Sequence, residues 1–138
     1  VRQRLQVLED LGLGYLTLGE ATPSLSGGEA QRLKLASEMG RGQSDSVFVF
    51  DEPTIGLHPL DVRTLLGVFE TLIQQGATVI VIEHDLDVMA NADYLIDLGP
   101  GGGEEGGRIV AAGTPAEIAA NPQSITGKYL GPVLGKVK

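Results

Sequence analysis

The sequence contains no cysteine and no tryptophan, and only 4% of its 138 residues are aromatic. Without cysteine, the chain can form neither disulfide bonds nor a thiolate zinc site. It has two histidines, His58 and His84, so a metal site would have to draw on carboxylates as well. The net charge of −8 argues against a broad nucleic-acid-binding surface on this chain, because such surfaces are basic.

Long apolar runs are also missing. No stretch approaches the roughly 20 apolar residues that a membrane-spanning helix needs, and there is no signal-peptide pattern. We therefore expect a cytoplasmic protein without a membrane partner. The apolar share of 42% supports a mainly aliphatic core, and the length fits one domain or less. Because the chain opens with Val1 inside a predicted helix, we expect a piece of a longer polypeptide.

The pattern of apolar residues predicts an α/β fold with a mostly parallel sheet flanked by helices. Strands are predicted at residues 47–50, 78–82, 94–98 and 108–112. Helices are predicted at residues 1–11, 26–39, 59–75 and 85–91, and from a capping box at residues 114–117. In the second helix, Leu33, Ala36 and Met39 share the apolar side and Arg32 is polar. The strand–helix–strand order over residues 47–82 predicts a right-handed crossover, and residues 124–138 are expected to form a tail.

The most informative stretch is the strand at residues 47–50 together with the two carboxylates after it. Four β-prone apolar residues without polar alternation predict a strand buried on both faces, as in parallel sheets. Asp51 and Glu52 follow at its carboxyl end, where open α/β sheets bind ligands. Buried charges are costly unless they are paired or bind a metal, so these acids predict a Mg²⁺–nucleotide site. The alternative is a polar strand end that only caps a loop.

A second informative stretch, Leu25-Ser26-Gly27-Gly28-Glu29, opens a predicted helix. A capping box explains Ser26 and Glu29. It does not explain the two glycines, each of which costs about 1 kcal/mol relative to alanine in a helix. Bare N–H groups at the positive end of a helix dipole suit a phosphate. We therefore predict an anion site at Ser26, Gly27 and Gly28, with Glu29 turned back toward the cap.

His84 follows the strand at residues 78–82. A lone histidine at a strand end is commonly a core residue with satisfied hydrogen bonds. The crossover, however, places this strand beside the one that ends at Asp51, so we predict that His84 contacts a transferring phosphoryl group. The sequence has no Gly-x-x-x-x-Gly-Lys-Ser/Thr loop, so a cradle for the β- and γ-phosphates is missing.

Together, these motifs resemble the ABC-type ATPase family. Residues 25–29 resemble its signature motif, residues 47–52 its Walker B strand, residues 56–61 its D-loop, and His84 its switch histidine. The resemblance implies a partial P-loop NTPase-like fold that lacks the Walker A segment. It further implies a signature-motif helical segment at residues 1–45 and a Walker B and switch-histidine segment at residues 46–138.

The same resemblance implies a role for each site residue. Asp51 would hold Mg²⁺ through water, Glu52 would polarise the attacking water, and His84 would act beside it. The cofactor-binding residues would be Ser26, Gly27, Gly28, Glu29 and Asp61.

Nearly end to end, the chain is similar to the C-terminal nucleotide-binding half of the UvrA family, the damage-sensing ATPases of bacterial nucleotide excision repair. Further stretches that carry this similarity are residues 12–15, 96–100, 112–115 and 126–130. The similarity implies ATP and Mg²⁺ as cofactors, with zinc only in parts of the parent protein outside this chain. The implied partners are a second nucleotide-binding domain in the same or another copy of a homodimer, a UvrB-like repair protein, and DNA through the parent protein.

Three alternatives remain open at this point. Ile55, where the C-terminal half is expected to carry a threonine, leaves room for a UvrA-like paralogue that serves drug resistance. The ATPase subunit of a membrane transporter shares the same motifs. A non-catalytic αβ interaction module would use them only structurally.

Overall fold

The computed structural model of the chain describes residues 2–14, 16, 19, 27–38, 45–99, 101 and 106–135. It divides into two compact units, Val1–Glu83 and His84–Lys138. In the described ranges, no helix is both long enough and apolar enough to cross a membrane. The predicted division at residues 45/46 follows motif content rather than packing and stays a prediction.

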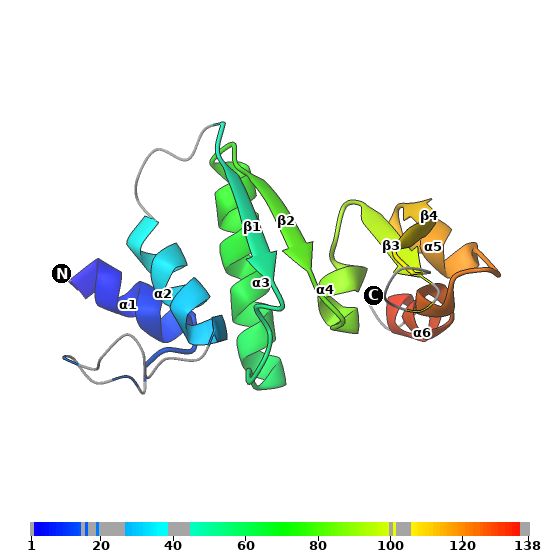
Figure 1. The fold of residues 1–138 in the computed structure, drawn as a ribbon. Coiled ribbons are helices and arrows are strands. Elements are labelled where there is room, and N and C mark those ends of the chain that lie inside the picture. Colours follow the sequence, from blue (N-terminus) through cyan, green and yellow to red (C-terminus); the bar gives the residue numbers. More distant parts are fainter. Residues whose placement is uncertain are drawn as a thin grey trace. The chain divides into compact units, whose positions relative to one another are not determined.

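The first unit is built around a parallel strand pair (Figure 1). Its elements are α1 (Arg2–Asp10), α2 (Gly27–Glu38), β1 (Val47–Asp51), α3 (Pro59–Gln74) and β2 (Thr78–Ile82). In the parallel register, Val47 lies opposite Thr78 and Asp51 opposite Ile82. The α/β class and the strand–helix–strand arrangement are therefore confirmed.

Helix α3 forms where the sequence pattern places it. Pro59 occupies its first turn, and the Nδ1 atom of the preceding His58 accepts a hydrogen bond from Leu60 N at 3.3 Å. Its buried side packs into the core of the unit, where the rings of Phe50 and Phe69 lie 4.9 Å apart. The chain leaves the helix through Gly76, whose φ of 94° suits glycine.

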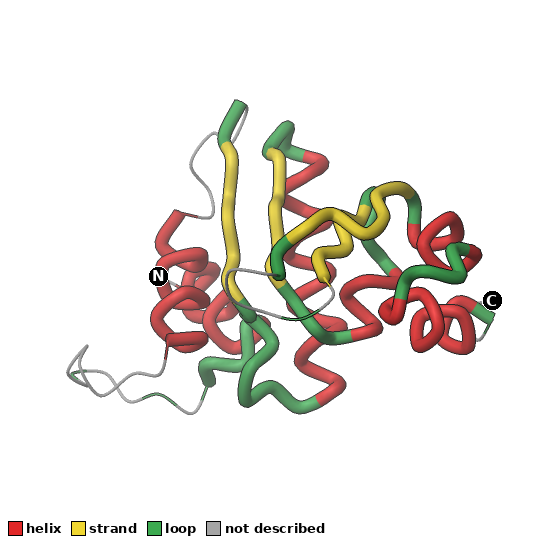
Figure 2. Tube along the Cα trace, turned by 45° about the vertical axis from the view of Figure 1, so that its right-hand side comes forward, coloured by secondary structure: helices red, strands yellow, loops and turns green. Residues whose placement is uncertain are grey.

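One expectation for the central strand is wrong. Phe50 is buried, but the alternate residues of β1 and β2 face outward and are 49–63% exposed. Helix α3 lies on one side of the strand pair (Figure 2), and among the described residues of this unit nothing buries the other side. A continuous apolar run therefore indicates that both faces of a strand can be buried, but in the described residues only the face toward α3 is buried. We call this surface the open β1–β2 face, and it consists of Val47, Val49, Ile80 and Ile82.

The second unit contains a separate antiparallel strand pair. Its elements are α4 (Leu86–Ala90), β3 (Leu95–Gly99), β4 (Arg108–Gly113), α5 (Pro115–Ala120) and α6 (Ile125–Leu134). The predicted capping box of α5 is confirmed, because Thr114 N donates to Glu117 Oε2 at 2.7 Å and Glu117 N donates to Thr114 Oγ1 at 3.3 Å.

The tail expected at residues 124–138 is wrong for its first part, which forms α6. Glycines and Pro132 lower its helix propensity, so the sequence pattern is weak. Packing outweighs propensity here, because Leu130 is fully buried and Ser124 caps the helix by accepting a hydrogen bond from Gly127 N at 2.8 Å. The carboxylate of Asp97 on β3 accepts further hydrogen bonds from Ser124 Oγ and Thr126 Oγ1, at 2.6 and 2.8 Å.

The two glycines of α6 differ in a way that can be tested. A Cβ atom at Gly127 would collide with the carbonyl oxygen of Ile118 on α5, whereas one at Gly131 would meet nothing within 4 Å. We expect Gly127→Ala to lower the free energy of unfolding by about 3 kcal/mol or more. The control Gly131→Ala should change it by less than about 1 kcal/mol, because the preference of alanine for the helix is opposed by contact with the following Pro132. Urea unfolding followed by circular dichroism measures both, and equal effects would contradict the assigned contact.

Candidate functional site

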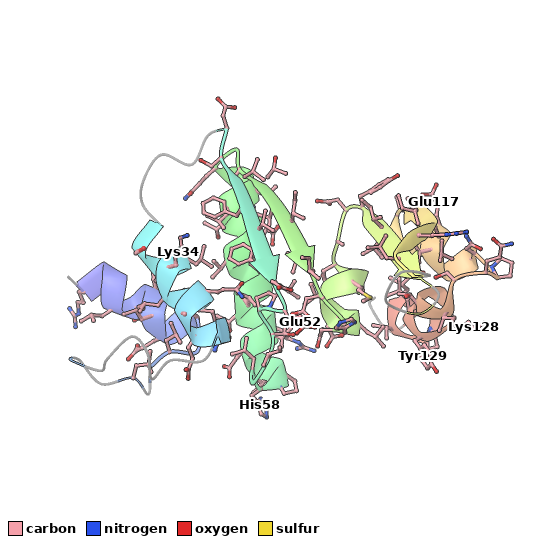
Figure 3. All side chains as sticks on the ribbon, in the orientation of Figure 1. Lys34, Glu52, His58, Glu117, Lys128 and Tyr129 are labelled. Atoms are coloured by element: carbon pink, nitrogen blue, oxygen red, sulfur yellow. The ribbon has the colours of Figure 1, made fainter. Side chains whose placement is uncertain are left out.

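The turn after β1 carries the two predicted acids. Asp51 ends the strand with an exposed side chain, Glu52 is half-buried, and Pro53 is fully buried. Figure 3 shows Glu52 beyond the end of β1. Its φ of 46° lies in the left-handed region, which residues other than glycine seldom occupy. We call residues 51–54 the acidic turn.

The first half of the acidic turn is held through its main chain. The side-chain amide of Gln31 on α2 pairs with Asp51 twice: Nε2 donates to the Asp51 carbonyl at 2.8 Å, and Oε1 accepts from Asp51 N at 3.1 Å. Glu52 N donates to the carbonyl of Ile82 on β2 at 2.8 Å. The backbone is thus fixed immediately before Glu52 and at its own nitrogen.

The second half is held in the same manner. Arg32 Nη1 donates to the Pro53 carbonyl at 3.0 Å, and Thr54 N donates to Glu83 Oε1 at 2.8 Å. A left-handed conformation of a residue other than glycine costs about 1–2 kcal/mol and persists where the surroundings over-determine it. Anchors on both sides of Glu52 meet that condition.

Arg32 is a buried cation, with 3% of its surface exposed, and its Nε has no hydrogen-bond partner among the residues that the structure describes. Burial lowers the pKa of its guanidinium, and the negative charges of Glu29 and Asp61 oppose that shift. Two residues assigned to nucleotide binding on sequence grounds thus stabilise the charge of Arg32.

The predicted anion site is described only in part. Gly27 and Gly28 form the first turn of α2, and Glu29 behind them is half-buried. Leu25 and Ser26 lie outside the described residues. The anion site and the predicted orientation of Glu29 stay predictions.

Asp61 lies in the first turn of α3, next to Gly12. A Cβ atom at Gly12 would come within 3.7 Å of Asp61 Cγ, and Gly12 has a φ of 72°. Asp61 therefore packs between elements of the first unit in this structure, and its role toward a nucleotide stays a prediction.

His84 is exposed at the start of the second unit. It borders an open pocket of about 250 Å³ within that unit, lined also by Leu86, Met89, Ile125, Thr126 and Tyr129. Its predicted approach to Asp51 and Glu52 would join the two units, and it stays a prediction.

A divalent metal is compatible with the donors present. In the described part of the chain, no three histidine, aspartate or glutamate side chains cluster to hold a metal by themselves. In nucleotide sites, however, Mg²⁺ is bound by one or two carboxylates with waters and phosphates. The exposed carboxylate of Asp51 fits that donor set.

Sequence reasoning missed Gln31, Arg32 and Glu83 as site residues. The predicted apolar side of the second helix is partly wrong, because Leu33 is 37% exposed whereas Arg32, Leu35 and Ala36 are buried. Arg32 lies three and four positions before Leu35 and Ala36, so helical spacing could have flagged a buried cation.

Comparison with known proteins gives consistent results. No protein-family model matches the chain. UvrABC system protein A of Aquifex aeolicus (strain VF5) is 55% identical over 137 residues, which are 99% of this chain and 15% of that protein. UvrABC system protein A of Lactiplantibacillus plantarum is 57% identical over 135 residues, or 97% of this chain and 14% of that protein.

Among solved structures, the crystal structure of UvrA2 from Deinococcus radiodurans matches with a TM-score of 0.87 and 52% identity. The match covers 95% of this chain and 16% of the UvrA2 chain. The chain therefore spans about 15% of the length of the curated relatives it matches.

The strain at Glu52 can be measured with two substitutions. Glu52→Ala and Glu52→Gly both remove the side chain, but only glycine adopts a φ of 46° without steric cost. We expect the glycine variant to be more stable than the alanine variant by about 1 kcal/mol. Urea unfolding of both variants tests this, and equal stability would show that the left-handed conformation is not held in solution. Glu70 on the exposed side of α3 is the control position, where glycine should be the less stable of the two.

Proposed function

Because this chain is homologous over nearly its whole length to one segment of UvrA proteins, we propose that it is part of the ATP-binding and ATP-hydrolysing machinery of a UvrA-type repair ATPase, from the C-terminal half of that protein. The acidic turn carries the proposal. Two acidic residues stand at the end of a parallel strand, and the backbone of Glu52 is held in a strained conformation by groups from α2, β2 and Glu83. Strain of this kind is concentrated at functional sites.

In the proposed mechanism, Asp51, Glu52 and His84 act together on one ATP molecule. Asp51 would hold Mg²⁺ through water, and the bound ion would supply positive charge that offsets the charge of the phosphates. Glu52 accepts a hydrogen bond from the attacking water and orients it in line with the γ-phosphate. His84 donates to the transferring phosphoryl group.

The chain serves a second ATP with the start of α2. Ser26, Gly27 and Gly28 donate to the γ-phosphate of an ATP held by a second nucleotide-binding domain, at the positive end of the helix dipole. We assign Glu29 and Asp61 to the same site, where their carboxylates also stabilise the charge of Arg32. The Walker A loop for each nucleotide comes from elsewhere in the parent protein, and so does any zinc.

We further propose that closure around both nucleotides changes how a cytoplasmic parent dimer holds DNA and a UvrB-like partner. ATP can drive this change only by binding the closed state better than the open one. The repair role is distinguished from that of a drug-resistance paralogue, or of a transporter ATPase, by what stimulates hydrolysis in the parent protein. Damaged DNA is expected to stimulate it, and stimulation by a membrane protein instead would favour the transporter.

The proposed general base can be tested in the full-length parent protein. Glu52→Gln should lower kcat for ATP about 100-fold or more while the Kd for ATP changes little, because the amide cannot take a proton from water. Glu70→Gln, on the exposed side of α3, serves as the control and should leave kcat unchanged. Ordinary turnover by Glu52→Gln would refute the assignment.

The division of the site between segments gives a second prediction. The 138-residue chain by itself should show no ATP turnover and no tight ATP binding, because it has no Gly-x-x-x-x-Gly-Lys-Ser/Thr loop. A phosphate-release assay and calorimetric titration with Mg²⁺–ATP measure this, with the full-length parent as positive control. Turnover at the parent's rate would contradict it.

A further inference from the structure

The anchors of the acidic turn have a common target. They fix the main chain of Asp51, Glu52, Pro53 and Thr54 one after another. What they determine is the backbone conformation on either side of that carboxylate. If φ of Glu52 returned to the ordinary negative range, its Cα–Cβ bond would swing through about 100°. The carboxylate would then point in a different direction.

We propose that Gln31, Arg32 and Glu83 are positioning residues for Glu52: they hold the acidic turn so that the carboxylate points at the water it polarises. This inference rests on the proposed function of Glu52. It concerns residues that touch the backbone of the turn and not the nucleotide.

Gln31 makes the most specific of these contacts. A primary amide carries a donor and an acceptor side by side, and Gln31 uses both, donating to the Asp51 carbonyl and accepting from Asp51 N. Glutamate of the same length keeps the acceptor and loses the donor, and it places a negative charge against a carbonyl oxygen. A Gln31→Glu change therefore breaks one bond of the pair with almost no change in volume.

The position of Gln31 also links the two proposed half-sites. It lies in the second turn of α2, the helix whose first turn is Gly27–Gly28. Arg32, the next residue, holds Pro53. A shift of α2 caused by a phosphate at its N-terminus would thus act on the main chain at both sides of Glu52. Binding of one nucleotide would be coupled to water activation at the other.

The test is a double-mutant cycle in the full-length parent protein. Gln31→Glu should lower kcat between about 10- and 100-fold, as expected for a misplaced catalytic group, with the KM for ATP within about twofold. In the Glu52→Gln background, the same change should lower kcat no further, because it acts through Glu52. An equal loss of kcat in both backgrounds would overturn the inference. Normal turnover by Glu52→Gln alone would instead overturn the proposed function.

Two controls separate positioning from folding. Lys34→Gln changes an exposed residue on the same helix (Figure 3) and should leave kcat and the Tm unchanged. If Gln31→Glu lowers the Tm of the parent, the Glu83 pair decides instead. Glu83→Gln keeps an oxygen that accepts from Thr54 N and should retain kcat within about threefold, whereas Glu83→Ala should lose about tenfold or more. Equal kcat for these two variants would refute the role of Glu83.

Discussion

The double hydrogen bond between the Gln31 amide and Asp51 is the contact on which the rest of the first unit depends. Asp51 is the last residue of β1, and the free edge of a two-stranded sheet leaves main-chain groups without a strand partner. The amide of Gln31 supplies a donor and an acceptor to that edge, as a residue of a neighbouring strand would. A helix is thereby joined to a strand at the point where the chain turns and where Glu52 adopts its left-handed conformation.

The second constraint is electrostatic. Arg32 follows Gln31 directly and is buried with its charge, which would be costly without compensation. Compensation comes from the Pro53 carbonyl and from the fields of Glu29 and Asp61. Acids that sequence motifs assign to nucleotide binding thus have a second task, because they allow a cation to sit between α2 and the turn after β1. The charge pattern and the backbone geometry of the turn belong to one arrangement.

Much of the fold was predictable because strong local signals agree with it. Residues 78–82 form a β-branched run without alternating polar residues, and β2 has the predicted bounds. Pro59 and Gly76 mark the two ends of α3. Helix α6 was not predictable by the same means, because glycine and proline weaken its pattern and its packing on α5 is not visible in helix propensity. The identities of Asp51 and Glu52 were visible in the sequence. The positive φ of Glu52 was not, because glutamate has no preference for it and residues 20 to 30 positions away impose it.

The open β1–β2 face has an energetic consequence. Fully covering an aliphatic side chain contributes about 1.5–3 kcal/mol relative to full exposure, so covering these four half-exposed residues would contribute on the order of 4 kcal/mol. Whole domains are stable by only about 5–15 kcal/mol. The strand pair that carries the acidic turn is therefore less stable when this surface faces water than when another polypeptide segment packs on it. Fluctuations that open the pair should be most frequent in the bare chain, and amide hydrogen exchange along β1 would report how far a cover suppresses them.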